Sequence, residues 1–194
     1  IQENEEEITE AGLVEYSRLN EMFYLFLIDN VKAMFDLITE DKCSVCIKIL
    51  DDEDSSQNIM VKTFIRDSGS YRERKVSDGF MMKYPYYDNA AFKTILSSDP
   101  VSYFVSDDLS SKPGYFNSNP KWKDYYNSTL VCPIRIKMGE EEREEQEYSV
   151  LGFICVDNHK GNLENKECIH LLASIADSIY NHFLLYNEFR SAAL

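Results

Sequence analysis

Two long segments, one at each end of the chain, carry apolar residues at every third or fourth position. The first runs from Ile8 to Ile38 and contains no Pro, and the second runs from Glu164 to Ala193. This spacing places apolar side chains along one side of an α-helix. The first segment therefore predicts one or two consecutive helices, and the second predicts a final helix.

Between these segments the period changes to two, which is typical of β-strands. Apolar and polar residues alternate in Lys42–Leu50 and again in Ile59–Ile65, with a short acidic turn between them. We expect these two strands to form an antiparallel pair. Three more strands are predicted at Val101–Val105, Leu130–Lys137 and Tyr148–Asp157. In the last of these both alternating sets are apolar, so we expect it to lie inside the sheet and not at an edge.

The remaining segments connect these elements. Residues 67–86 show no strong period, and Asn89–Ser97 has the pattern of a short helix that ends before Pro100. The loop Ser106–Asn127 contains the only Trp and several Tyr residues, and Met138–Glu147 is a highly charged connector that we expect to be a solvated hairpin loop. Helices at both ends of a run of strands predict an α+β fold, not a doubly wound parallel sheet.

Composition and charge narrow the classes of function. The chain has 194 residues, 44% of them hydrophobic, and a formal net charge of −14. Such a charge disfavours nucleic-acid binding and docking on an anionic membrane surface. We find no run of about 20 apolar residues that would span a bilayer. Because the chain begins at Ile1 without Met, we expect it to be a fragment, with membrane attachment only through a segment before Ile1.

Five cysteines form an odd set and lie mostly in apolar runs, so we expect buried free thiols and a reducing, cytoplasmic location. Cys43 and Cys46 have the spacing of a metal pair. Residues three apart on a strand point to opposite faces, so we expect them to hold no metal. The three histidines, His159, His170 and His182, are expected to have surface or packing roles.

Three segments resemble the GAF domain family in their order and spacing. They are Tyr126–Ile134, with its Pro in a strand, Val150–Asn158, with Gly between apolar residues, and Phe104–Leu109. The resemblance covers about residues 20 to 185. It implies a central antiparallel sheet of five to six strands, terminal helices on one face, and loops and a short helix that form a pocket on the other face. Residues 1–40 would be an N-terminal helical segment that serves in dimerisation, and residues 41–194 the GAF-like domain.

The resemblance and the aromatic loop together indicate where a ligand would bind. Aromatic side chains with a polar end are suited to line or close a pocket. The alternative is that these rings only cover an open face of the sheet. The expected ligand-binding residues are Tyr103, Ser106, Asp107, Tyr115, Trp122, Tyr126 and Ser128.

The sequence patterns that the family uses for particular ligands match this chain only in part or not at all. Members that bind cyclic nucleotides carry an Asn-Lys pair, a Phe and an Asp-Glu pair after the last strand, and only Asn158 and Glu167 match this pattern. No Cys-His dipeptide is present for bilin attachment. The ligand and any cofactor therefore stay unidentified.

We expect a regulatory domain that binds a small molecule, forms a homodimer through its terminal helices and is not an enzyme. The alternatives are a GAF scaffold without a ligand, which would serve only in dimerisation, and a cysteine-dependent methionine sulfoxide reductase. No catalytic residue is assigned.

Overall fold

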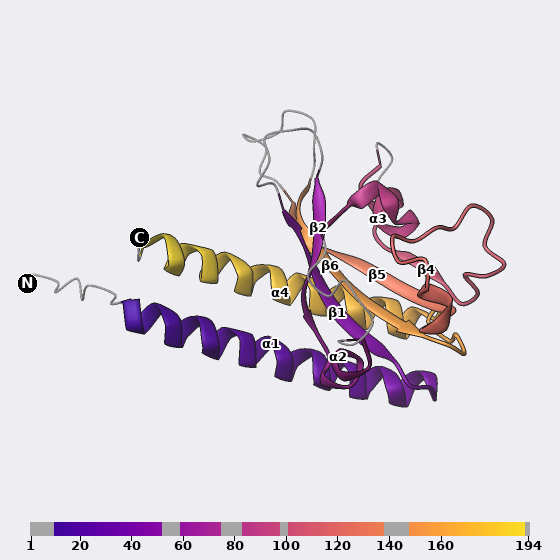
Figure 1. Ribbon diagram of the computed structural model, residues 1–194, viewed down its shortest axis with the longest axis horizontal. Helices are drawn as coiled ribbons and strands as arrows, with labels where there is room; N and C mark the ends of the chain where they lie inside the picture. Colours follow the sequence, from indigo (N-terminus) through magenta and orange to yellow (C-terminus); the bar gives the residue numbers. More distant parts are fainter. Residues whose placement is uncertain (1–9, 52–58, 75–82, 98–100, 138–147, 193–194) are drawn as a thin grey trace, which may run out of the picture.

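A central antiparallel sheet lies between two long helices and a layer of loops (Figure 1). The computed structural model describes residues 10–51, 59–74, 83–97, 101–137 and 148–192. Its helices are α1 (Glu10–Thr39), α2 (Ser68–Arg74), α3 (Ala90–Ile95) and α4 (Lys166–Ala192), with short 3-10 helices at Tyr86–Asp88 and Trp122–Asp124. Its strands are β1 (Ser44–Asp51), β2 (Met60–Arg66), β3 (Tyr84–Pro85), β4 (Phe104–Ser106), β5 (Ser128–Lys137) and β6 (Tyr148–Asn158). The expected α+β architecture is confirmed.

The strand order is β3-β2-β1-β6-β5-β4, and every neighbouring pair is antiparallel. β6 therefore lies between β1 and β5, so the interior position expected from its two apolar faces is confirmed. The expected β1–β2 pair is confirmed as well. Gly152 of β6 permits a close approach to β1, because a Cβ atom at this position would lie 2.1 Å from the carbonyl oxygen of Lys48.

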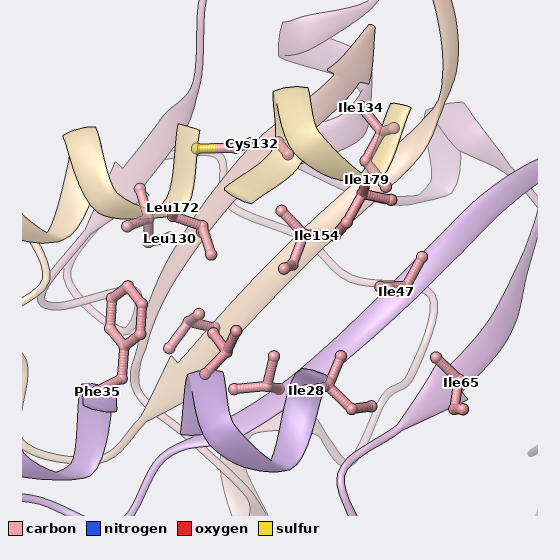
Figure 2. Close-up of a cluster of buried hydrophobic side chains, with 14 of the residues drawn as sticks. Ile28, Phe35, Ile47, Ile65, Leu130, Cys132, Ile134, Ile154, Leu172 and Ile179 are labelled. Carbon is pink, nitrogen blue, oxygen red and sulfur yellow. The ribbon is translucent and has the colours of Figure 1, made fainter. Parts of the chain in front are cut away.

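One face of the sheet packs against α1 and α4, which run antiparallel to each other on the same side (Figures 1 and 2). Tyr24, Ile28 and Phe35 of α1 are fully buried there. His182 of α4 packs between the two helices, since its Nδ1 is 2.8 Å from the Tyr24 hydroxyl and its ring stacks on Phe23 at 4.5 Å. The packing role expected for this histidine is confirmed. Each fully buried aliphatic or aromatic side chain contributes about 1.5–3 kcal/mol to stability.

The opposite face carries a second apolar cluster beneath α3 and the loop that precedes β5. Phe153 of β6 is fully buried, and its ring stacks on Phe92 of α3 with the ring centroids 4.4 Å apart. Asn89 begins α3, because its side-chain oxygen accepts hydrogen bonds from the backbone N–H groups of Ala91 (2.9 Å) and Phe92 (3.4 Å). The helix thus holds Phe92 over the sheet.

Two segments differ from the sequence prediction. Residues 67–86, for which no element was expected, contain α2 and the edge strand β3. α2 forms because buried Asp67 accepts hydrogen bonds from the N–H groups of Val45 (2.8 Å) and Ser70 (2.9 Å), while Asp29 of α1 accepts one from the N–H of Ser68 (2.8 Å). The contacts of Asp67 with Val45 and of Asp29 with Ser68 are tertiary, so the local pattern gives no sign of them, whereas the Asp67–Ser70 contact is a local helix cap.

The third predicted strand, Val101–Val105, is displaced toward the C-terminus. The observed strand β4 is Phe104–Ser106, where Phe104 and Ser106 are buried and pair with β5. Most of the acidic turn after β1 and the predicted loop Met138–Glu147 lie outside the described residues.

Candidate functional site

A cavity of about 440 Å³ lies on the loop face of the sheet. A row of side chains from four strands forms its floor: Arg66 of β2, Cys46 of β1, Cys155 of β6 and Val131 of β5 are successive cross-strand neighbours. Aromatic residues and the segment before the second 3-10 helix contribute the walls. They are Tyr84, Phe92, Tyr115, Asn117, Ser118, Asn119, Pro120, Lys121, Tyr125 and Tyr126.

The aromatic wall is fixed from behind by Trp122. The indole ring lies 5.0 Å from the ring of Tyr115 and 5.8 Å from that of Tyr126, centroid to centroid. The side-chain amide of Asn117 donates to the hydroxyl groups of Tyr126 (2.9 Å) and Tyr115 (3.2 Å). Burial raises the pKa of Tyr115 to about 12, so its phenol is neutral at physiological pH. The wall therefore offers apolar surface with hydroxyl groups in fixed positions.

The floor of the cavity carries two cationic side chains. Lys48 of β1 donates a hydrogen bond to the hydroxyl of Thr63 (3.0 Å), and its ammonium lies 5.3 Å from the ring centroid of Tyr84. Burial lowers the pKa of Lys48, whereas electrostatic attraction to Tyr84, Cys46 and Cys155 raises it, and on balance the pKa lies above its ordinary value. Arg66 is only 8% exposed and donates to the hydroxyl of Ser44 (3.3 Å). Both groups are thus charged at neutral pH.

Two thiols also face the cavity. Cys46 and Cys155 lie directly opposite each other on β1 and β6. A hydrogen bond with Cys46 and burial hold the pKa of Cys155 well above its usual range. Because the thiolate is the reactive form of cysteine, neither burial nor this hydrogen bond activates Cys155 as a nucleophile.

The remaining cysteines lie on the helix side of the sheet. Cys43, Cys132 and Cys168 belong to the core beneath α1 and α4, and all five cysteines are buried thiols. Cys43 and Cys46 thus pack into opposite cores, as their spacing on a strand predicts. Burial raises the pKa of Cys43 to about 11 and that of Cys132 to about 12. Within the described part of the chain, no group of three or more His, Cys, Asp or Glu side chains is arranged to hold a metal ion.

Of the four aromatic residues expected at the site, Tyr115 and Tyr126 line the cavity. Trp122 is buried behind them and contacts both rings, so it supports the wall without lining it. Tyr103 is 37% exposed and is not among the lining residues. The structure therefore brings three of the four aromatic residues together.

The three polar residues expected at the site are placed at the end of the sheet near α4. The Asp107 carboxylate accepts hydrogen bonds from the N–H groups of Leu163 (2.7 Å) and Glu164 (3.3 Å). The buried Ser128 hydroxyl is hydrogen-bonded to Asn158, and Ser106 is buried in β4. None of the three lines the cavity. The contacts of Asp107 and Ser128 join the ends of β4 and β5 to the end of β6 and to the segment before α4.

The partial match to the cyclic-nucleotide pattern also has a structural explanation. Asn158 is buried, where its side chain contacts Ser128 and donates to the carbonyl oxygen of Gly161 (2.9 Å). The N–H of His159 donates to the Asp41 carboxylate at 3.0 Å. Neither Asn158 nor Glu167 lines the cavity. Asn158 therefore closes the turn after β6.

Sequence reasoning missed the polar floor. Lys48 and Arg66 occupy positions that alternation assigns to the non-helical face of their strands, which in a sheet covered on one side would face water. The available signal was that Cys46, on the same face of β1, is also a residue type that is usually buried. A lysine two positions from a buried cysteine on one strand face indicates a covered polar site.

The similarity of this chain to known proteins is found among solved structures, and it concerns the fold. No protein-family model matches the sequence, and no curated protein matches it. Solved structures do match. A far-red cyanobacteriochrome photoreceptor is 12% identical with a TM-score of 0.56, over 88% of this chain and 93% of that one. The GAF domain region of a protein from Geobacter sulfurreducens is 14% identical with a TM-score of 0.52, over 87% of this chain and 99% of that one.

A third similar structure is that of an enzyme. It is the type II free methionine-R-sulfoxide reductase of Thermoplasma acidophilum, which is 17% identical with a TM-score of 0.53, over 83% of this chain and 92% of that one. At these identities the likeness concerns the fold, which is GAF-like. Among the helices that the structure describes, none is long and apolar enough to cross a membrane.

Proposed function

We propose that this GAF-like chain is a regulatory domain that binds a small organic molecule in the cavity and forms a homodimer along its terminal helices. The cavity carries the proposal. Its volume of about 440 Å³ lies in the range of about 300–1,000 Å³ found for small-molecule sites. Like such sites, it combines aromatic walls with a few polar groups in fixed positions.

A second apolar surface on α1 supports the dimer. The side of α1 that faces away from its own core carries residues at alternating intervals of four and three, the spacing of a coiled-coil seam. Phe23, Phe26 and Leu37 of this seam are 44%, 71% and 81% exposed. A helix of a monomer usually has one apolar stripe, and α1 has two. The seam residues are Leu19, Phe23, Phe26, Asn30, Ala33 and Leu37.

Asn30 favours a parallel, in-register arrangement of two such helices. It is exposed on α1 and lies within the apolar seam. An Asn in the seam of a coiled coil is satisfied when it faces the same Asn of a partner, and it disfavours other registers. A second copy of this chain provides that match, so the partner we propose is the chain itself.

The sheet connects the two surfaces. In β6, Phe153 and Cys155 face the cavity side, while Ile154 and Val156 pack beneath the helices. A ligand that shifts β6 would therefore also shift the contacts of α1 and α4. Such coupling changes the dimer only if the ligand binds two arrangements of the helices with different affinities.

Native mass spectrometry of the purified chain tests the ligand. We expect an adduct of small mass on the wild-type chain and on Tyr103→Ala, because Tyr103 lies outside the cavity. Tyr126→Ala should lose the adduct, and Tyr126→Phe, which keeps the ring, should retain most of it. A chain that carries no adduct, and that binds no compound in titrations, would leave the ligand-free scaffold as the better description.

Sedimentation at about tens of micromolar tests the dimer. Phe26→Glu with Leu37→Glu places charges in the seam and should give a folded monomer, since these side chains are 71% and 81% exposed in the single chain. Phe23 is left unchanged because its ring also stacks on His182. Val14→Glu is the matched control: Val14 is 66% exposed on α1 but lies away from the seam. A wild-type chain that sediments as a monomer would refute the dimer.

A cysteine-dependent reductase is the second candidate. It is favoured by the reductase among the similar structures and by the two thiols that face the cavity. The test is consumption of free methionine sulfoxide with dithiothreitol as reductant. Because burial and mutual hydrogen bonding keep the Cys155 thiol protonated, we expect no turnover. Turnover by the wild type that is lost in Cys155→Ser would instead support the reductase.

A further inference from the structure

The charge of the cavity is opposite to that of the chain. The whole chain has a formal net charge of −14. Among the residues that line the cavity are four cationic side chains, Lys48, Arg66, Lys83 and Lys121, and one carboxylate, Asp157. A concave site lined by one sign of charge concentrates ligands of the opposite sign. The lining therefore favours an anion although the protein as a whole repels one.

Lys83 and Lys121 contribute less to the attraction of an anion than Lys48 and Arg66 on the floor. The Lys83 ammonium lies 2.8 Å from the Asp51 carboxylate, and Lys121 is exposed. Charges in such positions are screened by water and salt. Lys48 and Arg66, in contrast, lie on the covered floor, where electrostatic interactions are stronger.

The floor cations act on each other unfavourably. Arg66 is the cross-strand neighbour of Cys46, and Lys48 follows Cys46 by two residues on the same face of β1. Although the pKa of Lys48 lies above its ordinary value overall, the positive charge of Arg66 acts to lower it, as expected between like charges. Within the described residues no carboxylate lies within ion-pair distance of either group. An anion between them would relieve this repulsion.

The nearby carboxylates are already engaged in other contacts. Asp157 and Asp67 both attract Arg66, and the two Asp67 oxygens accept the N–H groups of Val45 and Ser70. Asp157 accepts the hydroxyl of Thr129 at 2.6 Å. A guanidinium has five N–H donors, and the one side-chain hydrogen bond of Arg66, to Ser44, uses few of them. The group thus has donors left for a ligand in the cavity.

We infer that the ligand is a flat organic anion whose carboxylate or phosphate group binds Lys48 and Arg66, while its body packs against the tyrosine wall. This inference rests on the proposed function, since it names the chemical class of the molecule in the same cavity. Arg suits the acid group because its planar fork of donors matches carboxylate and phosphate oxygens. The rings of Tyr84, Tyr115 and Tyr126 suit a flat body.

Two compounds of almost equal shape test the charge requirement. 2-Naphthoate carries a carboxylate, and 2-naphthamide replaces it by a neutral amide. We expect calorimetric titration of the wild-type chain to show naphthoate binding at least about tenfold more tightly than the amide, because charge-assisted hydrogen bonds exceed neutral ones. Equal affinities would overturn the inference and leave the cavity as a binding site.

Three lysine variants test which positive charge binds the acid group of the ligand. Lys48→Met should lower naphthoate affinity about tenfold and leave the amide unchanged, and Lys48→Arg should restore the preference. Lys93→Met on α3 is the matched control, because it removes the same charge close to the cavity but outside its lining. If Lys93→Met has the same effect as Lys48→Met, the preference for naphthoate over the amide comes from the electrostatic field of the whole protein, and the assignment to Lys48 is wrong. If neither compound binds and no adduct is retained, the proposed ligand function fails together with this inference.

Discussion

Replacement of Phe153 by Ala should strongly reduce the free energy of unfolding of the chain. Phe153 is fully buried, and its ring stacks on Phe92 at 4.4 Å with an interplanar angle of 18°. Truncation of a buried Phe costs about 3–5 kcal/mol, which already includes most of the stacking contribution. A domain of this kind has about 5–15 kcal/mol of stability in total. The variant should therefore fold, but it should unfold at a lower urea concentration than the wild type.

Urea titration measures this loss. With an m-value of about 2 kcal/mol per molar, a loss of about 4 kcal/mol lowers the midpoint by about 2 M. The fluorescence of Trp122 reports the cavity-side cluster, and far-ultraviolet circular dichroism reports the whole fold. Phe116→Ala is the control: Phe116 is 41% exposed, so its truncation should cost less than about 1 kcal/mol. Equal midpoints for the two variants would refute the packing described for Phe153.

Three further predictions concern the sheet, the thiols and acid stability. Gly152→Ala should destabilise by about 1–3 kcal/mol in thermal melts, because the new methyl would meet the Lys48 carbonyl, and an unchanged melt would contradict the 2.1 Å approach. The buried thiols should react with Ellman's reagent only after denaturation, and one fast-reacting thiol in the folded chain would contradict this. Ion pairs with Lys62 and Lys83 lower the pKa of Asp51 from 3.8 to about 2. Their stabilisation is therefore present above about pH 4 and is lost as the pH falls toward 2, and Asp51→Asn should remove this part of the acid transition.

Periodicity was sufficient for the elements whose own residues determine them. The two long helices and the interior strand β6 follow from apolar spacing alone, because each buries a continuous stripe or two continuous faces. α2 is different. Its start depends on Asp29 and Asp67, which reach it from α1 and from the end of β2. Asp67 directly precedes α2 and is a local cap, but the seven residues of α2 carry no information about the partner on α1.

The cavity was only partly predictable for a related reason. Aromatic residues in the loop before β5 indicated a wall, and Tyr115 and Tyr126 are indeed there. The floor depends on which polar residues of β1 and β2 are covered by α3 and the loop. A register shift between β1 and β2 places both Thr63 and Arg66 on the cavity side, which alternation does not show. Whether that side meets water or a cavity is decided by a segment far away in the sequence. Asp107 and Ser128 resembled site residues but connect backbone segments instead.

The floor of the cavity also determines when a binding site can exist during folding. Its central row joins Cys46 of β1 to Cys155 of β6, so strands from opposite parts of the chain must pair before the row is complete. Closing so long a loop is slow, and sheets built from such pairings fold later than local elements. During synthesis the row is incomplete until β6 has been made. A ligand would then bind only the finished fold and would stabilise it by mass action, so it would slow unfolding without accelerating folding.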